Sequence, residues 1–270
     1  MRILRKLLRF TFTCLLSLSV VGFGLESLIS SARAETMDLV SVSKKIRGQV
    51  VQIVVPTPDG TRISLGTGFW LNDQGVIATC WHVVSANPTG RIMVQSAVDP
   101  LFDLAKRNNI TANWQVFSAS VVAKDEPNDL AILKVSVNPF GAQKSVPIQI
   151  GNVELVAHFA SATLNRDLPE AGARVLMAGF PLGQPYLIVQ EGTVAALAYN
   201  LPGWGATNKI LVSTLSNHGN SGAPIFDMQG KVIAILEGED RAQGQDQERT
   251  GISVAIPAYF VSKLAETIHP

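Results

Sequence analysis

A serine stands among small residues in the segment 217–224, whose sequence is NHGNSGAP. Asn, Gly and Ser gather in loops for conformational reasons alone, so one interpretation is an ordinary turn. The other interpretation is chemical, because a nucleophilic serine needs open space and backbone N–H groups that are free to bind an oxyanion. In that case Ser221 is the nucleophile, and the N–H groups of Gly219 and Ser221 form the oxyanion hole.

Two further residues could complete such a site. His82 ends the expected strand in GVIATCWHVV, where a general base is both held and exposed; packing beside Trp81 is the alternative. Asp129 directly precedes the apolar run LAILKV, so its carboxylate can point inward and orient the base; an ordinary turn aspartate is the alternative. The order His82, Asp129, Ser221 differs from that of an α/β-hydrolase, in which the serine comes first in a G-x-S-x-G elbow.

The remaining histidines do not indicate a metal site. His158 lies in the apolar stretch VELVAHFA and is expected to pack, and His269 is next to the last residue of the sequence. No pair of histidines has the spacing typical of zinc ligands. We therefore expect no metal and no cofactor.

Residues 1–34 have the layout of a secretory signal peptide. A basic start is followed by an apolar run of about 15 residues and by Ala32-Arg33-Ala34, which offers small residues for cleavage. The alternative is an uncleaved membrane anchor, although the run is shorter than the roughly 20 residues that a spanning helix needs. We expect a mature chain from Glu35 with no membrane span, exported to a bacterial periplasm or secreted.

Composition bounds the remaining possibilities. The 270 residues are 47% apolar and 16% charged, which allows a large core. The leader holds five of the 22 basic and one of the 21 acidic residues, so the mature chain carries a net charge of −3 instead of +1. This excess of acid gives no support to a nucleic-acid partner. Cys14 is in the leader, so Cys80 remains alone and cannot form an intramolecular disulfide.

The elements that must position these residues are mostly β-strands. Short β-branched runs form two groups, at about 48–137 and 148–268, joined by a turn-rich linker at about 138–147. A short helix is expected within 36–47 and a closing helix at 258–268, and a polar stretch at 238–250 connects the last two strands. Two β-barrels or two sandwiches side by side fit this pattern, with the site in the cleft between them.

Several blocks resemble trypsin-like (chymotrypsin-fold) serine peptidases, most closely the protease domain of the HtrA/Deg family. They carry GTGFWLNDQGVIATCWHVV, NDLAILKV, GARVLMAGFPLGQPYLIVQEGTVAAL, GNSGAPIFDMQGKVIAI and GISVAIP. The resemblance implies two antiparallel six-stranded β-barrels with the active site between them and a C-terminal helix. It also implies a serine endopeptidase that cuts protein or peptide substrates through a His82–Asp129–Ser221 triad and an acyl-enzyme.

The resemblance also has limits. Ala223 stands where the family has glycine, the segment 99–113 looks like an insertion, and the PDZ module usual in the family is not expected here. By the resemblance, Leu215 lies at the bottom of the S1 pocket and His218 at its rim, which favours small aliphatic residues before the cleaved bond. A catalytically silent, protease-like protein-binding module is the alternative, and the oligomeric state is not indicated.

Overall fold

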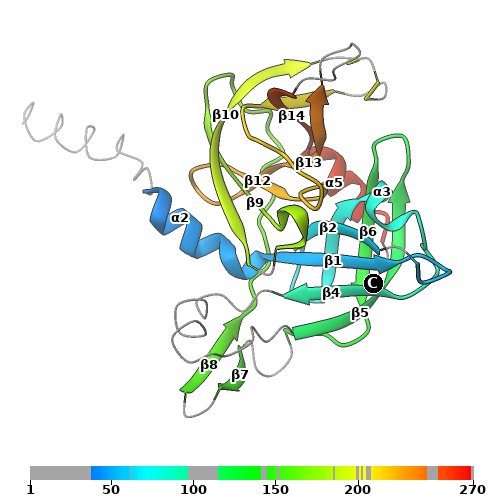
Figure 1. Ribbon diagram of the computed structural model, residues 1–270. Helices are drawn as coiled ribbons and strands as arrows, with labels where there is room; N and C mark the ends of the chain where they lie inside the picture. The colour runs from blue at the N-terminus through cyan, green and yellow to red at the C-terminus, as the bar shows by residue number, and fades with distance from the viewer. Residues whose placement is uncertain are drawn as a thin grey trace, which may run out of the picture. The chain divides into compact units, whose positions relative to one another are not determined.

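Figure 1 shows the computed structural model of the chain. The described residues are 38–61, 63–96, 115–140, 145–150, 153–184, 186–198, 201, 203–204, 208–241 and 249–268. The expected signal peptide and the segment 99–113 lie outside them. The expected domain limits stay a prediction.

The first barrel contains six strands rich in β-branched residues, which suit a pleated and half-buried surface. They pair antiparallel and close in the order β1-β2-β3-β6-β5-β4. Trp70 is fully buried inside and packs edge-on against Phe117, Phe140 and Phe159, with ring centroids 5.4–6.2 Å apart. The strands are β1 (Val50–Pro56), β2 (Ile63–Trp70), β3 (Val76–Cys80), β4 (Ile92–Ser96), β5 (Gln115–Asp125) and β6 (Leu130–Val135).

The second barrel also has six antiparallel strands, which close in the order β10-β11-β14-β13-β12-β9. Its interior is filled by alternate residues of these strands, such as Ile210 and Val212 of β11 and Ala255 of β14. The strands are β9 (Arg174–Gly179), β10 (Ile188–Ala198), β11 (Lys209–Val212), β12 (Pro224–Phe226), β13 (Val232–Arg241) and β14 (Arg249–Pro257). Two more strands, β7 (Ser145–Ile150) and β8 (Val153–His158), form a separate two-stranded sheet between the barrels in sequence.

Short helices connect and close these sheets. Helix α2 (Leu39–Ile46) begins at Asp38, whose side chain accepts a hydrogen bond from the Ser41 N–H, and the turn η1 (Arg47–Gln49) leads into β1. Helix α3 (Trp81–Val84) follows β3, and the turn η2 (Pro181–Gly183) follows β9. Helix α5 (Ala258–Ala265) contacts β5 and β6 of the first barrel and β13 and β14 of the second.

The predicted fold class is confirmed: two antiparallel six-stranded barrels and a C-terminal helix. The barrels meet along the Ser221 loop, by which we mean residues 217–223. The N–H of Thr67 in β2 donates to the carbonyl oxygen of Ser221, at an N···O distance of 2.8 Å. The site therefore lies where the first barrel meets this loop.

Candidate active site

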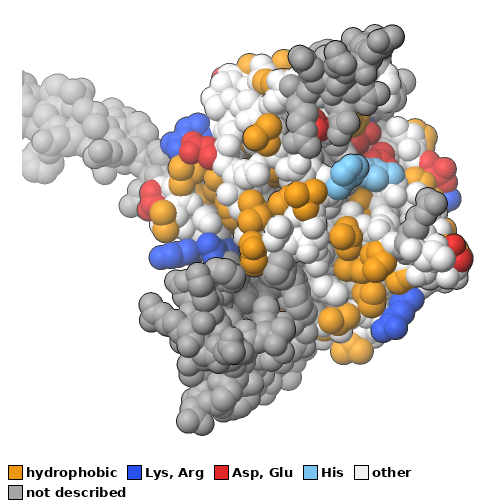
Figure 2. Space-filling view, in the orientation of Figure 1, with side chains coloured by type: hydrophobic (Ala, Val, Ile, Leu, Met, Phe, Trp, Pro, Cys, Tyr) orange, Lys and Arg blue, Asp and Glu red, His pale blue; other side chains and the backbone are white. Residues whose placement is uncertain are grey.

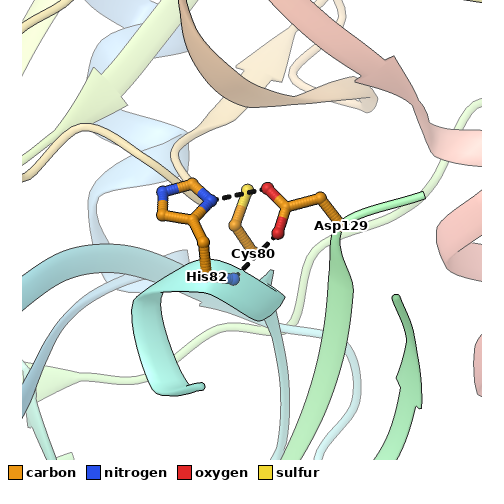
Figure 3. Close-up of side chains that lie close together, drawn as sticks. All are labelled: Cys80, His82 and Asp129. Carbon is orange, nitrogen blue, oxygen red and sulfur yellow. Dashed lines mark hydrogen bonds and ion pairs between the residues drawn. The ribbon is translucent and has the colours of Figure 1, made fainter. Parts of the chain in front are cut away.

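His82 is positioned by helix α3, which starts as soon as β3 ends. Asp129 holds it in two ways: the His82 N–H donates to Oδ1 at 2.8 Å, and Nδ1 of the ring lies 2.6 Å from Oδ2 (Figure 3). The Trp81 N–H also donates to the Asp129 carbonyl oxygen, at 3.0 Å. An ionised carboxylate can only accept, so Nδ1 carries a hydrogen and Nε2 is left free to act as a base.

Asp129 has an unusual backbone conformation. Its φ is 53°, in the left-handed region that most residues with a side chain avoid and that Asp tolerates better than most. Its N–H donates to the Glu126 carbonyl oxygen at 3.0 Å, which closes the turn before β6. Such conformations persist where the surroundings over-determine them, often at functional sites. The strained turn delivers the carboxylate to both donors of His82.

The electrostatic surroundings favour the charged imidazolium. Burial alone would lower the pKa of His82, but the hydrogen bond to Asp129 and the negative charges of Asp129 and Glu237 outweigh it, so the pKa is raised above its ordinary value. The ring keeps 49% of its side-chain surface exposed. A base with this environment can accept a proton readily and still be reached from solvent.

The Ser221 loop needs its two glycines. Gly219 has a φ of 94° and Gly222 a φ of 86°, values that side chains rarely permit. A Cβ on Gly219 would lie 2.4 Å from the Phe180 carbonyl oxygen, and one on Gly222 would lie 2.0 Å from the Thr67 carbonyl oxygen. The small residues around Ser221 are thus required by close backbone approach as well as by conformation.

Thr67 and the turn η2 tether this loop. The Thr67 hydroxyl donates to the Gly219 carbonyl oxygen at 2.7 Å and accepts from the Phe180 N–H at 3.1 Å. The Leu182 N–H donates to the His218 carbonyl oxygen at 2.6 Å. The C=O and N–H of one trans peptide point in opposite directions, so this bond turns the Gly219 N–H away from Leu182. The Gly219 N–H, one of the two donors expected in the oxyanion hole, therefore belongs to a backbone segment that is held on both sides.

The Ser221 hydroxyl does not lie against His82. It donates to the Glu237 carbonyl oxygen at 3.3 Å, and among the described residues it makes no hydrogen bond to the imidazole. The structure thus brings His82 and Asp129 together and leaves Ser221 directed elsewhere. Hydrogen bonds of this kind are often long or poorly aligned before substrate binds.

The two predicted specificity residues lie on the surface. Leu215 is 56% exposed, and His218 is exposed as well. Figure 2 shows histidine side chains together on the face of the molecule, beside a band of hydrophobic ones.

The other two acids near Asp129 in sequence, Asp125 and Glu126, bond other residues. The Asp125 carboxylate accepts a hydrogen bond from the Asn128 side chain, and Glu126 pairs with Lys124.

Three residues of the site were missed by the sequence interpretation. They are Thr67, Lys209 and Glu237, and the last two form an ion pair with Nζ 2.5 Å from Oε2. The Lys209 side chain is 0% exposed and that of Glu237 is 12% exposed. The available signals were Lys209, which starts the apolar run KILV, and Glu237, which ends the run VIAILE. Because the two are 28 residues apart, the sequence did not indicate that they pair.

Cys80, His82 and Asp129 bring together atom types that can bind metals, with all three ligand atoms within 4.8 Å of one another. Their hydrogen bonds argue for another use. The Cys80 thiol is buried and donates to the Leu236 carbonyl oxygen at 3.2 Å. Burial and the nearby charges of Asp129 and Glu237 raise its pKa, which disfavours the thiolate. The expectation of no metal stays a prediction.

Two closed six-stranded barrels with this site between them define a chymotrypsin-like fold. The profile of the trypsin-like peptidase domain matches residues 66–235, which is more than half of the chain. The chain belongs to the trypsin-like peptidase family.

Curated relatives are named as serine endoproteases, DegP-like or DegS. The chain is 26% identical over 214 residues to a probable periplasmic serine endoprotease, DegP-like, of Marinomonas sp. (strain MWYL1), covering 79% of this chain and 37% of that protein. It is 27% identical over 207 residues to the serine endoprotease DegS of Escherichia coli (strain K12), covering 76% of this chain and 48% of DegS. The chain thus spans about half or less of the length of these relatives.

Solved structures share the fold. The HtrA-type protease AlgW with tripeptide matches with a TM-score of 0.62 at 22% identity, covering 86% of this chain and 63% of that one. The Rv3671c protease from M. tuberculosis, active form, matches with a TM-score of 0.61 at 20% identity, covering 84% and 83%. Among the helices in the described part of the chain, none is long and apolar enough to span a membrane.

Proposed function

We propose that this chain is an exported serine endopeptidase that cleaves protein or peptide substrates by a His82–Asp129–Ser221 triad. The observation that carries the proposal is the double hydrogen bond of Asp129 to His82, which holds the imidazole with Nε2 free. Membership of the trypsin-like peptidase family adds to it.

The mechanism follows from the roles of these groups. The Ser221 hydroxyl rotates from the Glu237 carbonyl oxygen toward His82 and gives its proton to Nε2 as Oγ bonds to the substrate carbonyl carbon. The Gly219 and Ser221 N–H groups stabilise the oxyanion that forms. The imidazolium then protonates the leaving amine as the C–N bond breaks, which leaves an acyl-enzyme. Water, activated by the same imidazole, adds to the acyl carbon and releases Ser221.

The proposed substrates have a small aliphatic residue before the cleaved bond. By resemblance to trypsin-like enzymes, Leu215 lines the S1 pocket and offers no carboxylate to Lys or Arg, and His218 stands at the rim. Cleavage profiling with a peptide library tests this, and a profile dominated by Arg, Lys or Glu refutes it.

Export is supported by the leader pattern and by relatives named periplasmic. The proposed mature N-terminus is Glu35, in a bacterial envelope or in the medium. N-terminal sequencing of the protein from a secreting host tests it. An intact Met1 in the membrane fraction would mean an anchor instead.

The second candidate is a catalytically silent, protease-like module that binds a protein partner. It is favoured by one observation, the Ser221 hydroxyl bonded to Glu237 and not to His82. A fluorophosphonate probe separates the two, because it labels only an activated serine. Labelling of the wild type and none of Ser221→Ala supports the peptidase. No labelling of either, with peptide binding in the cleft, supports the silent module.

A further inference from the structure

The Lys209–Glu237 pair is an unusual feature of the second barrel. Lys209 is among the largest fully buried side chains of the described residues, and its partner Glu237 is nearly buried too. Taking two charges out of water costs several kcal/mol per ion, and such pairs can often be replaced by apolar residues without loss of stability. Stability alone therefore gives a weak reason for this pair.

The location of the Lys209–Glu237 pair gives a better reason for its presence. The pairing of β13 with β14 shifts register between Leu236 and Gly238, so Glu237 sits at an irregularity of the strand. The Glu237 carbonyl oxygen accepts the Ser221 hydroxyl at 3.3 Å. The preceding carbonyl, of Leu236, accepts the Gly222 N–H at 2.8 Å and the Cys80 thiol at 3.2 Å. Two successive carbonyls of β13 thus contact the Ser221 loop and the strand that leads to His82.

The pair also contributes charge. Lys209 of β11 pairs directly with Glu237. His82, Asp129 and Cys80 of the first barrel interact with Glu237 electrostatically. The pKa of Glu237 is raised above its ordinary value. Burial is the largest cause and the charge of Asp129 adds to it, while Lys209 and His82 act in the opposite direction without cancelling it. The negative end of the pair acts in turn on the imidazole, since Glu237 is one of the groups that raise the pKa of His82.

We propose that Lys209 and Glu237 are positioning residues of the active site. Their ion pair fixes the irregular point of β13, so that the adjacent Leu236 carbonyl oxygen keeps its bonds to the Gly222 N–H and the Cys80 thiol. It also places a negative charge on the second-barrel side of the His82–Asp129 pair. The inference deepens the proposed function and rests on it.

The first measurement is independent of activity. The His82 imidazole is titrated by NMR in a Ser221→Ala background, with and without Glu237→Gln. Glu237→Gln keeps an acceptor for Lys209 and removes the charge, so the His82 titration should move to lower pH. The matched control is Glu191→Gln, which removes an exposed carboxylate of the same barrel that pairs with Arg174 at 2.6 Å. The control should leave the His82 titration in place.

The second measurement uses the active protein. Lys209→Met leaves the buried Glu237 carboxylate without its ion-pair partner, so the irregular point of β13 is no longer held. We expect kcat to fall about tenfold or more while KM stays within about threefold. Lys209→Met/Glu237→Leu removes both charges and should keep the fold even if the single variant is unstable. Its kcat should remain below that of the wild type, because the anchor of β13 is lost.

These outcomes separate the two proposals. A wild type that fails to react with a fluorophosphonate refutes the peptidase, and the His82 titration then decides the present inference alone. In an active protein, a His82 titration that Glu237→Gln leaves unmoved overturns the inference. A wild-type kcat in the folded double variant overturns it as well.

Discussion

The two halves of the site are built differently. On the first barrel, His82 and Asp129 lie at the ends of paired strands, and Asp129 holds the imidazole through two direct bonds of 2.8 and 2.6 Å. On the second barrel, Ser221 lies in a loop whose shape depends on glycines and on the distant Thr67. Regular elements hold the His82–Asp129 pair, whereas the position of Ser221, the proposed nucleophile, depends on long-range backbone contacts.

This contrast predicts where the site can be damaged. Changes to His82 or Asp129 should remove chemistry without altering the loop. Changes around the loop should disturb the oxyanion donors while leaving the His82–Asp129 pair intact.

The largest effect is expected from removing the reacting groups themselves. Ser221→Ala and His82→Ala should each lower kcat by about 10⁶-fold, because neither group works without the other. Thermal unfolding should stay nearly unchanged. Steady-state kinetics and calorimetry make the comparison, and full activity in Ser221→Ala would end the triad assignment.

Asp129→Asn should lower kcat less than the removal of Ser221 or His82, because both of those groups stay in place. The amide can donate to the imidazole and stabilise the wrong tautomer, so kcat should fall by about 10⁴-fold. Asp125→Asn, in the same turn, is the control; its carboxylate bonds Asn128 and not the imidazole. Equal losses in the two variants would mean that the turn, and not the carboxylate at His82, matters.

Gly219→Ala attacks the second-barrel half. A Cβ there would lie 2.4 Å from the Phe180 carbonyl oxygen, so the loop must shift and lose an oxyanion donor, which should cost about 10²–10³-fold in kcat. Gly172→Ala is the control, with a φ of 87° but nothing within 4 Å of its Cβ. A similar loss of activity in both would trace the effect to general backbone strain.

Thr67→Val tests the tether between the halves. It leaves the Gly219 carbonyl oxygen and the Phe180 N–H without their partner, a cost of about 1–3 kcal/mol, and should lower kcat roughly tenfold. Thr67→Ser restores the hydroxyl and should restore kcat. Thr193→Val, which removes a bond to Ser213 elsewhere in the second barrel, should have no effect on kcat. Failure of Thr67→Ser to rescue activity would point to packing instead.

The smallest effect is a shift in pH dependence. Because the pKa of His82 is raised, the acidic limb of kcat/KM should have its midpoint above about 6.5, the ordinary value for histidine. The sign for stability is opposite: the charged imidazolium stabilises the folded state at low pH, and this contribution fades as pH rises through the raised pKa. A midpoint below 6.5 in the kinetic profile would contradict the effect of Asp129 and Glu237.

The sequence predicted that His82 and Asp129 belong together, and they are bonded to each other, but it gave no sign of how the Ser221 loop is held; the catalytic roles stay a prediction. Short β-branched runs predicted the strands and left barrels and sandwiches both open. The family resemblance predicted the two barrels, which the structure confirms, and both terminal helices were predicted from their patterns. The polar stretch 238–250 was expected to be only a connection, but β13 runs to Arg241 and β14 starts at Arg249. Strand ends whose side chains face solvent can be as polar as a loop, so polarity alone does not reveal that they pair.

The remaining features depend on register and on distant partners. Lys209 looks like the polar start of a strand until the fold places Glu237 two strands away, across β14. The direction of the Ser221 hydroxyl depends on one rotatable bond, which no sequence pattern encodes. Thr67 differs from other strand threonines only because the loop of the other barrel lies against it.

The tether from Thr67 has a consequence for how activity arises during synthesis. The first barrel, which holds His82 and Asp129, is synthesised before the segment that holds Ser221. The loop around Ser221 takes its shape only when β2 of the finished first barrel can donate to it. A chain caught half folded would thus have a base and no competent serine. Cleavage of neighbouring proteins would then begin only after both barrels have closed.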